Sequence, residues 1–237
     1  MLSLVIPTYN EGNNINRLLA ELNRSFKENK ISAEIIIVDD NSPDGTGEMC
    51  KRLSKKQKNI IVIQRPGKLG LSSAVIDGFR KAKGDVIGVM DADFSHPVEI
   101  IAKMFAEINN GADLVIGSRY TSGGGIKGWP FTRKITSWGA TTLALPFTRL
   151  KDPVSGLFMF RSSVIGGIEL SPIGYKIGLE VIVKGKYKKV VEVPYVFVNR
   201  KVGKTKLNLK EYANYLRQLA GLIIFKVSGK IKIRSVT

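Results

Sequence analysis

The stretch DVIGVMDADFSHP, Asp85–Pro97, decides how the rest of the chain is interpreted. It opens with an apolar run, Val86–Met90, which has the length of a buried parallel strand and leads directly into Asp91, Ala92 and Asp93. Residues two apart in a strand point to the same side, so Asp91 and Asp93 converge if the chain stays extended through Ala92. Converging carboxylates need a cation, and their oxygens suit Mg²⁺ or Mn²⁺, ions that commonly hold phosphates. The alternative is a turn in which an aspartate caps the next helix.

Predicted strands and helices alternate along the first half of the chain. The apolar runs that predict strands are Leu2–Ile6, Glu34–Val38, Ile60–Ile63, Val86–Met90 and Asp113–Gly117. Helical patterns follow the loop that begins at Pro7, follow the turn-rich NSPDGTG as far as about Lys58, and cover Leu71–Lys83 and Pro97–Asn110. This alternation predicts an α/β fold with a mostly parallel central sheet and helices on both faces.

Acidic residues follow two of the predicted strands. Asp39 and Asp40 end the second strand, as Asp91 and Asp93 end the fourth. Ligands of parallel sheets bind beyond the carboxyl ends of the strands, so these four carboxylates should lie at the binding edge. No GxGxxG follows the first strand, and no GxxxxGK followed by Ser or Thr occurs anywhere. A nucleotide would therefore be held without either of these phosphate-binding motifs.

The second half of the chain departs from this alternation. The glycines of Gly123–Gly128 predict a mobile loop that suits a lid. The segment Asp152–Phe160 should return the chain toward the sheet, and Val190–Val198 is predicted as one strand that Pro194 places at an edge. The basic segment RKVGKTK, Arg200–Lys206, is typical of a phosphate-binding loop.

The composition fits one globular domain with an anionic partner. The chain has 237 residues, 43% of them hydrophobic, and we expect a single domain over 1–237. Its 37 basic and 20 acidic residues leave a net charge of +17, which favours a nucleotide, a nucleic acid or an acidic membrane surface as partner. Cys50 is the one cysteine, so no internal disulfide can form, and with the lone His96 it cannot build a zinc site. These features favour a reducing, cytoplasmic location.

The sequence predicts a peripheral relation to membranes. No signal peptide is visible, and no apolar run reaches the ~18 residues that a bilayer requires, so we expect no transmembrane segment. The longest uncharged segment, Ile135–Thr148, is interrupted by Gly139 and Pro146 and suits the surface of a membrane or a lipid groove. The segment 208–237 predicts a C-terminal amphipathic helix and a basic tail that would attract anionic lipid. A membrane-anchoring partner protein is the alternative means of attachment.

Several segments carry a resemblance to a known family. They are IPTYNEGNNI, VDDNSPDGT, GLSSAVIDGF, VMDADFSHP, GSRY, WPFTRK, KDPVSGLFMF, PIGYK, GKYKKVVEVPY and the loop GKTKL. Together they resemble the dolichol-phosphate (polyprenyl-phosphate) mannose synthases of glycosyltransferase family 2, over nearly the whole chain. The resemblance implies a GT-A fold, a GDP-mannose donor, and Mg²⁺ or Mn²⁺ as cofactor. It also implies transfer with inversion to a dolichyl or other polyprenyl phosphate at the cytosolic face of a membrane.

The resemblance assigns site residues as well. The residues that it places at the donor nucleotide or its ribose are Pro7, Tyr9, Glu11, Asp39, Asp91 and Ala92. It assigns the metal to Asp91 and Asp93, with Ser95 at the position where other members place a glutamine ligand. The residues that it places at the donor and acceptor phosphates are Arg119, Arg133 and Arg200, assisted by Ser137 and Lys206. Guanidinium groups bind phosphate oxygens in pairs, which a lysine cannot reproduce.

Three residue types have plainer interpretations. A polyprenyl phosphate is already an anionic nucleophile, with a second pKa of about 6, so it needs no general base. We therefore expect Asp152 to have a structural or positioning role, paired with a basic neighbour. His96 is expected to be a turn residue near the site. Trp129 and Trp138 are equally compatible with the core and with lipid contact.

Other functions compete with this one. Within the enzyme class, the rival is a glucosyltransferase that uses UDP-glucose with the same lipid acceptor. A basic nucleic-acid-binding module would also explain the net charge of +17. However, the basic residues are not interleaved with an aromatic platform or a recognition helix, so we expect no nucleic acid as partner. A catalytically silent sugar-nucleotide sensor is the third alternative, and the intact acid pair argues against it.

Overall fold

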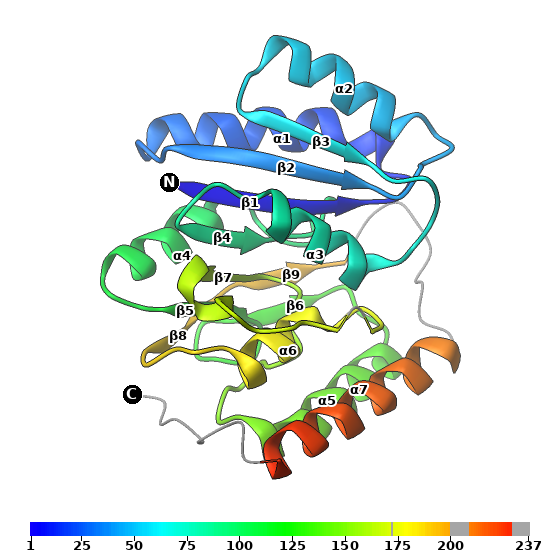
Figure 1. Ribbon diagram of the computed structural model, residues 1–237, viewed down its shortest axis with the longest axis vertical. Helices are drawn as coiled ribbons and strands as arrows, with labels where there is room; N and C mark the ends of the chain where they lie inside the picture. The colour runs from blue at the N-terminus through cyan, green and yellow to red at the C-terminus, as the bar shows by residue number, and fades with distance from the viewer. Residues whose placement is uncertain (172, 200–208, 229–237) are drawn as a thin grey trace.

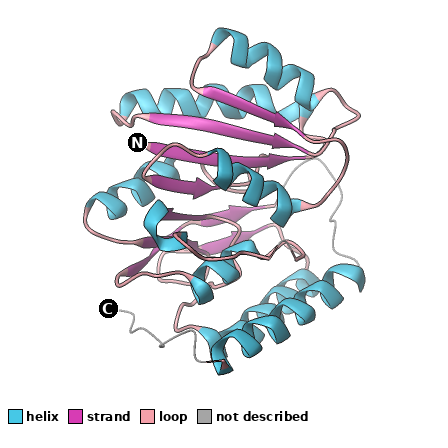
Figure 2. Cartoon of the chain, in the orientation of Figure 1, coloured by secondary structure: helices cyan, strands magenta, loops and turns pink. Residues whose placement is uncertain are grey.

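The computed structural model describes residues 1–171, 173–199 and 209–228. Within these residues the chain forms a seven-stranded sheet of order β3-β2-β1-β4-β7-β5-β8, with helices on both faces, and a two-stranded sheet β6-β9 (Figures 1 and 2). The strands are β1 (Leu2–Thr8), β2 (Ala33–Asp39), β3 (Ile60–Gln64), β4 (Val86–Val89), β5 (Leu114–Ser118), β6 (Gly125–Lys127), β7 (Phe158–Arg161), β8 (Val190–Pro194) and β9 (Val196–Val198). The predicted α/β architecture is confirmed.

The helices connect and cover these strands. They are α1 (Gly12–Glu28), α2 (Thr46–Lys56), α3 (Leu71–Lys81), α4 (Glu99–Asn109), α5 (Phe131–Ala144), α6 (Ile177–Lys184) and α7 (Leu209–Val227), with the short 3₁₀ helices η1 (Leu145–Phe147) and η2 (Ser162–Ile165). Strands β1 to β4 pair in parallel through β1–β2, β2–β3 and β1–β4, and β5 pairs in parallel with β8. The carboxyl ends of these strands therefore meet at one edge of the sheet.

Strand β7 is the exception to the parallel order. It lies antiparallel between β4 and β5, with Phe158 opposite Val89 and Ile116. The segment Asp152–Phe160 thus returns to the sheet, as predicted, and enters its interior. Because β7 runs against its neighbours, the loop that precedes it lies at the same edge as the carboxyl ends of β4 and β5.

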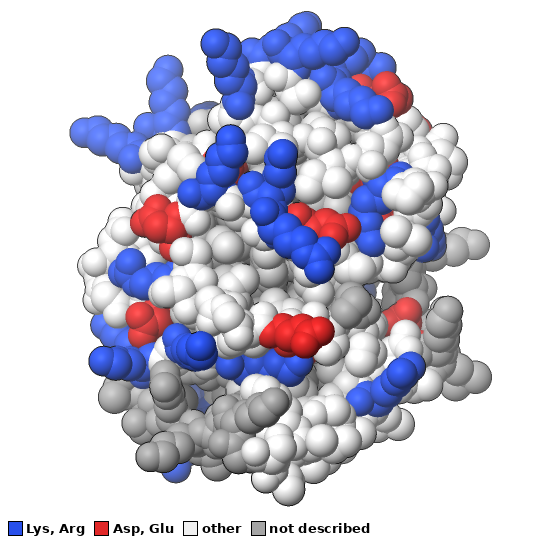
Figure 3. Space-filling model, in the orientation of Figure 1, with Lys and Arg blue, Asp and Glu red and all other residues white. Residues whose placement is uncertain are grey.

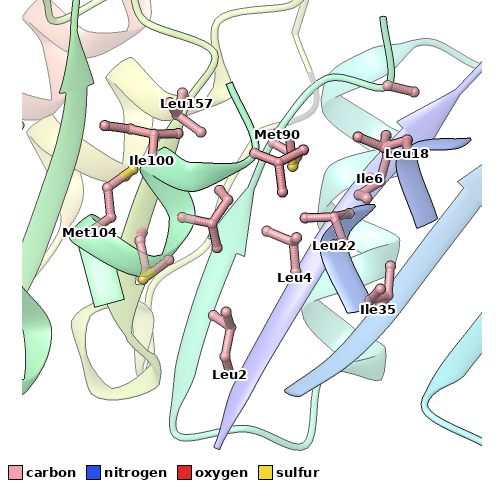
Figure 4. Packing of buried hydrophobic residues seen from close by; sticks show 14 of the residues in the cluster. Leu2, Leu4, Ile6, Leu18, Leu22, Ile35, Met90, Ile100, Met104 and Leu157 are labelled. Atoms are coloured by element: carbon pink, nitrogen blue, oxygen red, sulfur yellow. The ribbon is translucent and has the colours of Figure 1, made fainter. Parts of the chain in front are cut away.

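The core follows from the alternation of side chains along each strand. On β1, Leu2, Leu4 and Ile6 face the cluster covered by α1, α2 and α4, whereas Val5 faces the cluster covered by α3 and α6 (Figure 4). Burying each such side chain contributes about 1.5–3 kcal/mol. A Cβ at Gly78 of α3 would collide with Val5, so the close packing of α3 on the sheet requires glycine there.

Two predictions for the second half are wrong. The segment Val190–Val198 is two strands, because the chain leaves the main sheet after Pro194 and pairs again through β9. The edge position predicted from Pro194 is confirmed, since β8 is the last strand of the main sheet. The segment Gly123–Gly128 contains β6, whose Gly125–Lys127 lies parallel to Val196–Val198. The backbone groups expected to lie in a loop are therefore held in a small sheet.

Helices α5 and α7 lie side by side at one end of the molecule (Figure 1). The hydroxyl of Tyr215 donates a hydrogen bond to the carbonyl oxygen of Ala140 at 2.6 Å, and Tyr215, Leu219 and Leu222 pack in a cluster with Ala144. None of the helices in the described ranges is long and apolar enough to cross a membrane. The predicted basic tail lies outside the described residues.

Candidate active site

A cavity of about 930 Å³ lies at the edge of the sheet where the parallel strands end. A volume of this size suits a ligand of several hundred daltons. The predicted site residues that line it are Pro7, Tyr9, Glu11, Asp91, Ala92, Asp93, Arg119, Arg133 and Ser137. Asp39 and Ser95 are not among its lining residues. Arg200 and Lys206 lie outside the described residues.

The two aspartates reach the cavity by a turn. Strand β4 ends at Val89, so the condition of an extended chain through Ala92 is not met. The chain reverses at Phe94, whose φ of 58° lies in the left-handed region that bulky residues rarely adopt. The backbone N–H of Ser95 donates to Oδ1 of Asp93 at 3.0 Å and closes the turn. Helix α4 starts without a side-chain cap, so neither aspartate is used to cap it.

The carboxylates of Asp91 and Asp93 fit a divalent cation. In the described part of the chain, no third His, Cys, Asp or Glu joins them to form a larger metal-binding group. Two carboxylates with phosphate oxygens and water complete the ligand set that Mg²⁺ commonly takes at phosphates. The hydroxyl of Ser95 is buried and, among the described residues, has no hydrogen-bond partner. The predicted role of Ser95 as a metal ligand stays a prediction.

The buried side chain of His96 contacts the turn that carries Asp91 and Asp93. Its side chain is 1% exposed, and Nδ1 accepts a hydrogen bond from the backbone N–H of Asp91 at 3.3 Å. Its ring packs edge-on against Tyr195 and Phe197. Burial lowers the pKa of His96 to about 4, so the imidazole is neutral at physiological pH. The expected turn residue is thus a buried hydrogen-bond acceptor that fixes the position of Asp91.

The acids that follow β2 have different surroundings. Asp39 is fully buried, and its carboxylate accepts hydrogen bonds from the hydroxyls of Thr8 and Ser42 at 2.8 and 2.6 Å. Asp40 lines the cavity and pairs with Nη1 of Arg65 at 2.6 Å. The predicted contact of Asp39 with the ribose or base stays a prediction, and the structure gives its carboxylate protein donors.

The loop after β1 forms one end of the cavity. Tyr9 presents its ring to the ammonium group of Lys68, which lies 4.1 Å from the ring centroid. The backbone N–H of Glu11 donates to the hydroxyl of Thr46 at 3.0 Å, and the side chain of Glu11 accepts from Asn14. We give the name donor wall to six cavity residues that lie at the end of β1 or in the loops after β1, β2 and β4: Pro7, Tyr9, Glu11, Asp40, Asp91 and Asp93.

Arg119, at the end of β5, is bound by Asp152. Its Nε and Nη2 donate to the two carboxylate oxygens at 2.7 Å each, and its backbone N–H donates to Oδ2 at 2.9 Å. Arg119 is 7% exposed and Asp152 is fully buried. The expected pairing of Asp152 with a basic neighbour is confirmed, and it occupies the guanidinium edge that was predicted to bind phosphate.

Arg133, on α5, is held by residues that follow β6 and β9. Its guanidinium lies 4.2 Å from the centroid of the Trp129 ring, and Nη1 donates to Oδ1 of Asn199 at 2.8 Å. Asn199 in turn donates to the carbonyl oxygen of Gly128 at 3.0 Å. Trp129 is therefore a buried anchor of the site, whereas Trp138 is 67% exposed. Ser137 lies on the same helix and bonds the hydroxyl of Tyr120 at 3.0 Å.

Lys176 is a site residue that the sequence did not single out. It precedes α6, lines the cavity, and donates from Nζ to the carbonyl oxygen of Val154 at 2.8 Å. Burial, together with the nearby charge of Arg119, lowers the pKa of Lys176 to about 8. The motif PIGYK contains Lys176, but a single lysine in a loop has the pattern of a solvated surface residue. Only the fold shows that it lines the cavity.

The residues opposite the acidic turn form a second group. We call the cavity residues on α5, on the loop before α6 and on α7 the acceptor wall; its polar members include Arg133, Ser137, Lys176, Glu211 and Arg217. Three of these five are basic. On the donor wall Asp40 is paired with Arg65 and Lys68 lies against Tyr9, so the acidic character of this wall comes from Glu11, Asp91 and Asp93. The two walls of one cavity thus have opposite charge.

Sequence comparisons place the chain in a known family. The family model described as Glycosyl transferase family 2 matches residues 3–168. A dolichol-phosphate mannosyltransferase of Pyrococcus furiosus is 48% identical over 97% of this chain, which spans 65% of that relative's length. Proteins of the same name from Mycosarcoma maydis and Saccharomyces cerevisiae are 37% and 36% identical over 94% and 99% of this chain, and 79% and 91% of their own lengths.

Solved structures show the same fold. Glucosyl-3-phosphoglycerate synthase from Mycobacterium tuberculosis, in complex with Mn²⁺, UDP and phosphoglyceric acid, matches 99% of this chain and 80% of its own with a TM-score of 0.63 at 15% identity. A mannosyltransferase from Pyrobaculum calidifontis, in complex with GDP-Man and Mn²⁺, matches 98% and 65% with a TM-score of 0.61 at 16% identity. The expected GT-A fold is therefore confirmed. With the residues matched by the family model and the identity to the three relatives, this chain belongs to glycosyltransferase family 2, as a homologue of the dolichol-phosphate mannosyltransferases.

Proposed function

We propose that the chain is an inverting glycosyltransferase that transfers mannose from GDP-mannose to a dolichyl or other polyprenyl phosphate. The observation that carries the proposal is the division of one cavity into an acidic donor wall and a basic acceptor wall. Two anionic reactants that meet in one cavity need opposite charge at both of their phosphates, a cation at the donor and basic side chains at the acceptor. The names of the three relatives support the choice of sugar and of acceptor.

The proposed step is a single displacement. An oxygen of the acceptor phosphate attacks the anomeric carbon of the mannosyl group and supplies the electron pair of the new bond. The bond between that carbon and the β-phosphate oxygen breaks, and GDP leaves with its electron pair. No proton has to be removed from the attacking oxygen near neutral pH. Asp152, the carboxylate on the returning loop, is accordingly bound to Arg119 and is not available as a base.

The residues of the donor wall have separate tasks in this proposal. Asp91 and Asp93 would hold Mg²⁺ or Mn²⁺, which when bound neutralises the donor diphosphate and the departing GDP. Pro7, Tyr9 and Glu11 would contact the nucleotide. His96 keeps Asp91 in place through its backbone. Arg200 and Lys206, outside the described residues, stay predicted phosphate ligands.

The acceptor wall continues onto a surface that suits a lipid membrane. Large apolar side chains are exposed on both helices, among them Phe131 (75%) and Trp138 (67%) on α5 and Ile224 (70%) and Val227 (82%) on α7. On the face shown in Figure 3, the described atoms at the end where α5 and α7 lie include few charged side chains, whereas many basic ones lie at the opposite end. We propose that α5 and α7 lie on the cytosolic face of a membrane, where the polyprenyl chain of the acceptor resides.

One assay tests the donor, the acceptor and the metal together. The protein is incubated with radiolabelled GDP-mannose or UDP-glucose, Mn²⁺ and a polyprenyl phosphate, and label in the organic phase is counted. We expect label from GDP-mannose only, and none after EDTA is added. Label from UDP-glucose alone would establish the rival glucosyltransferase. No label from either donor, with a protein that binds GDP, would refute the proposed transfer.

A further inference from the structure

Because Arg119 is paired with Asp152, another cation is required to bind the acceptor phosphate. Both donor atoms on one edge of its guanidinium are used by Asp152, and the pair is buried. A paired carboxylate cancels the charge of the arginine, so this pair adds little net attraction for a dianion. The cavity must therefore gain its positive charge from other side chains.

Lys176 lines the cavity and can supply both a positive charge and hydrogen-bond donors for a phosphate. An ammonium group carries three donors, and the described structure shows one hydrogen bond from Nζ, to the carbonyl oxygen of Val154. In the described part of the chain, no carboxylate pairs with it within 4.0 Å. A neutral carbonyl leaves the charge uncancelled. Lys176 therefore brings a full positive charge to the wall that also contains Arg133.

The backbone of Lys176 is fixed from two sides. Its carbonyl oxygen accepts a hydrogen bond from the N–H of Leu179 at 3.1 Å and another from Nε2 of Gln218 at 3.1 Å. Gln218 belongs to α7 and is 4% exposed. The ring of Tyr175 lies 4.7 Å from the ammonium nitrogen. A lysine whose backbone is held in this way loses less entropy when its ammonium group binds a ligand.

We propose that Lys176 binds the acceptor phosphate directly, beside Arg133, and thereby makes the site specific for a phosphate monoester over the corresponding alcohol. The inference rests on the proposed function and adds a residue to its acceptor site. The positive charge of Lys176 attracts a dianion, whereas a neutral hydroxyl gains almost nothing from it. The ammonium of the half-buried Lys176 also remains partly desolvated when an alcohol occupies the site, which disfavours that occupant.

The inference has a consequence for the dependence on pH. The ammonium is charged below the lowered pKa of about 8, so acceptor affinity should fall as pH rises through that value. A bound phosphate dianion stabilises the protonated form of Lys176 and so raises its pKa. The fall in activity at alkaline pH should therefore occur at higher pH in the profile of kcat than in that of kcat/KM. The charged and titratable groups around the ammonium are Arg119, Asp152, Asp91 and Arg133, with Tyr175 beside it and Glu211 and Arg217 on the facing helix.

Binding of farnesyl phosphate and of farnesol tests the inference without turnover. Isothermal titration with the wild-type protein should show the phosphate binding at least about tenfold more tightly than the alcohol. In Lys176→Gln, whose amide can still donate to Val154, this preference should fall about tenfold while GDP affinity stays within twofold. Lys176→Arg should retain most of the preference. The control Lys103→Gln removes an exposed lysine from α4 and should change neither ligand.

The outcomes separate this inference from the proposed function. An unchanged phosphate preference in Lys176→Gln, or a loss of GDP affinity in its place, overturns the role of Lys176. If the wild-type protein prefers farnesyl phosphate but transfers no mannose, the proposed reaction is refuted, whereas the inferred phosphate site is still supported. Where transfer is observed, the alkaline limb near pH 8 in kcat/KM should disappear in Lys176→Gln and move to higher pH in Lys176→Arg. A limb that persists unchanged in both variants contradicts the inference.

Discussion

The donor wall and the acceptor wall differ in charge and in construction. The donor wall stands on loops that directly follow β1, β2 and β4, each set by strands paired in parallel. The acceptor wall stands on α5, the loop before α6 and α7, which are joined through contacts such as that of Tyr215 with Ala140 and that of Gln218 with Lys176. The donor wall is therefore fixed by local βα units, whereas the acceptor wall depends on contacts between segments that are distant in the sequence.

The largest effect should come from removing charge at the donor wall. Asp93→Asn takes one negative charge from the proposed cation site, and we expect turnover to fall about a thousandfold or more while the fold is unchanged. The measurement is mannose transfer with Mn²⁺ titrated over a wide range, with circular dichroism as the check on folding. Wild-type turnover in this variant, with and without EDTA, would contradict the assignment of the metal to the donor wall.

The buried ion pair of Arg119 with Asp152 should matter most for stability. Asp152→Asn leaves Arg119 charged and without its carboxylate in a buried position, and we expect the free energy of unfolding to fall by about 3 kcal/mol. Chemical denaturation measures this. The matched control is Glu28→Gln, which breaks the exposed pair with Arg24 and should cost ~0.5 kcal/mol or less. If both variants lose the same free energy of unfolding, burial of the Arg119–Asp152 pair has no effect on stability.

Arg133 sharpens the comparison between the walls. Arg133→Lys keeps the charge but loses the guanidinium plane that stacks on Trp129 and bonds Asn199. We expect KM for the polyprenyl phosphate to rise about tenfold, the cost of one charge-assisted hydrogen bond, with GDP-mannose affinity unchanged. Steady-state kinetics and calorimetry give the two quantities. If donor affinity falls and the acceptor KM does not, Arg133 belongs to the donor wall.

The smallest effect should be on attachment to membranes. Trp138→Ser and Ile224→Ser each remove an exposed apolar side chain from α5 or α7, and each should weaken binding to anionic vesicles by about 1 kcal/mol, or roughly fivefold. Vesicle flotation measures the binding, which should also fall with added salt. Leu69→Ser removes an exposed leucine near the donor wall and should leave flotation unchanged. A loss in Leu69→Ser equal to the other two would mean that the apolar face of α5 and α7 is not the contact surface.

The same division explains what could be predicted from the sequence. Alternating apolar runs set β1 to β4 and the acids that follow them, because strand periodicity and βα order are local properties. The segment Val190–Val198 has the pattern of one strand, and only its pairing with two different sheets shows that it is two. The pairing of Arg119 with Asp152 joins positions 33 residues apart and was predicted for Asp152 without its partner.

The final helix shows the limit of periodicity. The predicted amphipathic helix is present as α7, but Tyr215, Leu219 and Leu222 are the residues that pack inward, whereas Tyr212, Leu216 and Ile223 are exposed. A helix that carries apolar side chains on two faces gives no signal for which face meets the protein. Lys176 escaped notice for a similar reason, because its environment is made by α7 and by the loop before β7.

The antiparallel strand in the middle of the sheet constrains how the protein is made. Strand β7 pairs with β4 through Phe158 and Val89 and with β5 through Phe158 and Ile116, so both earlier strands have an unpaired edge until the chain has been synthesised through β7. During translation the emerging chain would expose these apolar edges, which are prone to pair with other chains. At ~5–20 residues per second this exposure lasts several seconds. The main sheet can therefore be completed only late in synthesis, after β7 and then β8 have been made.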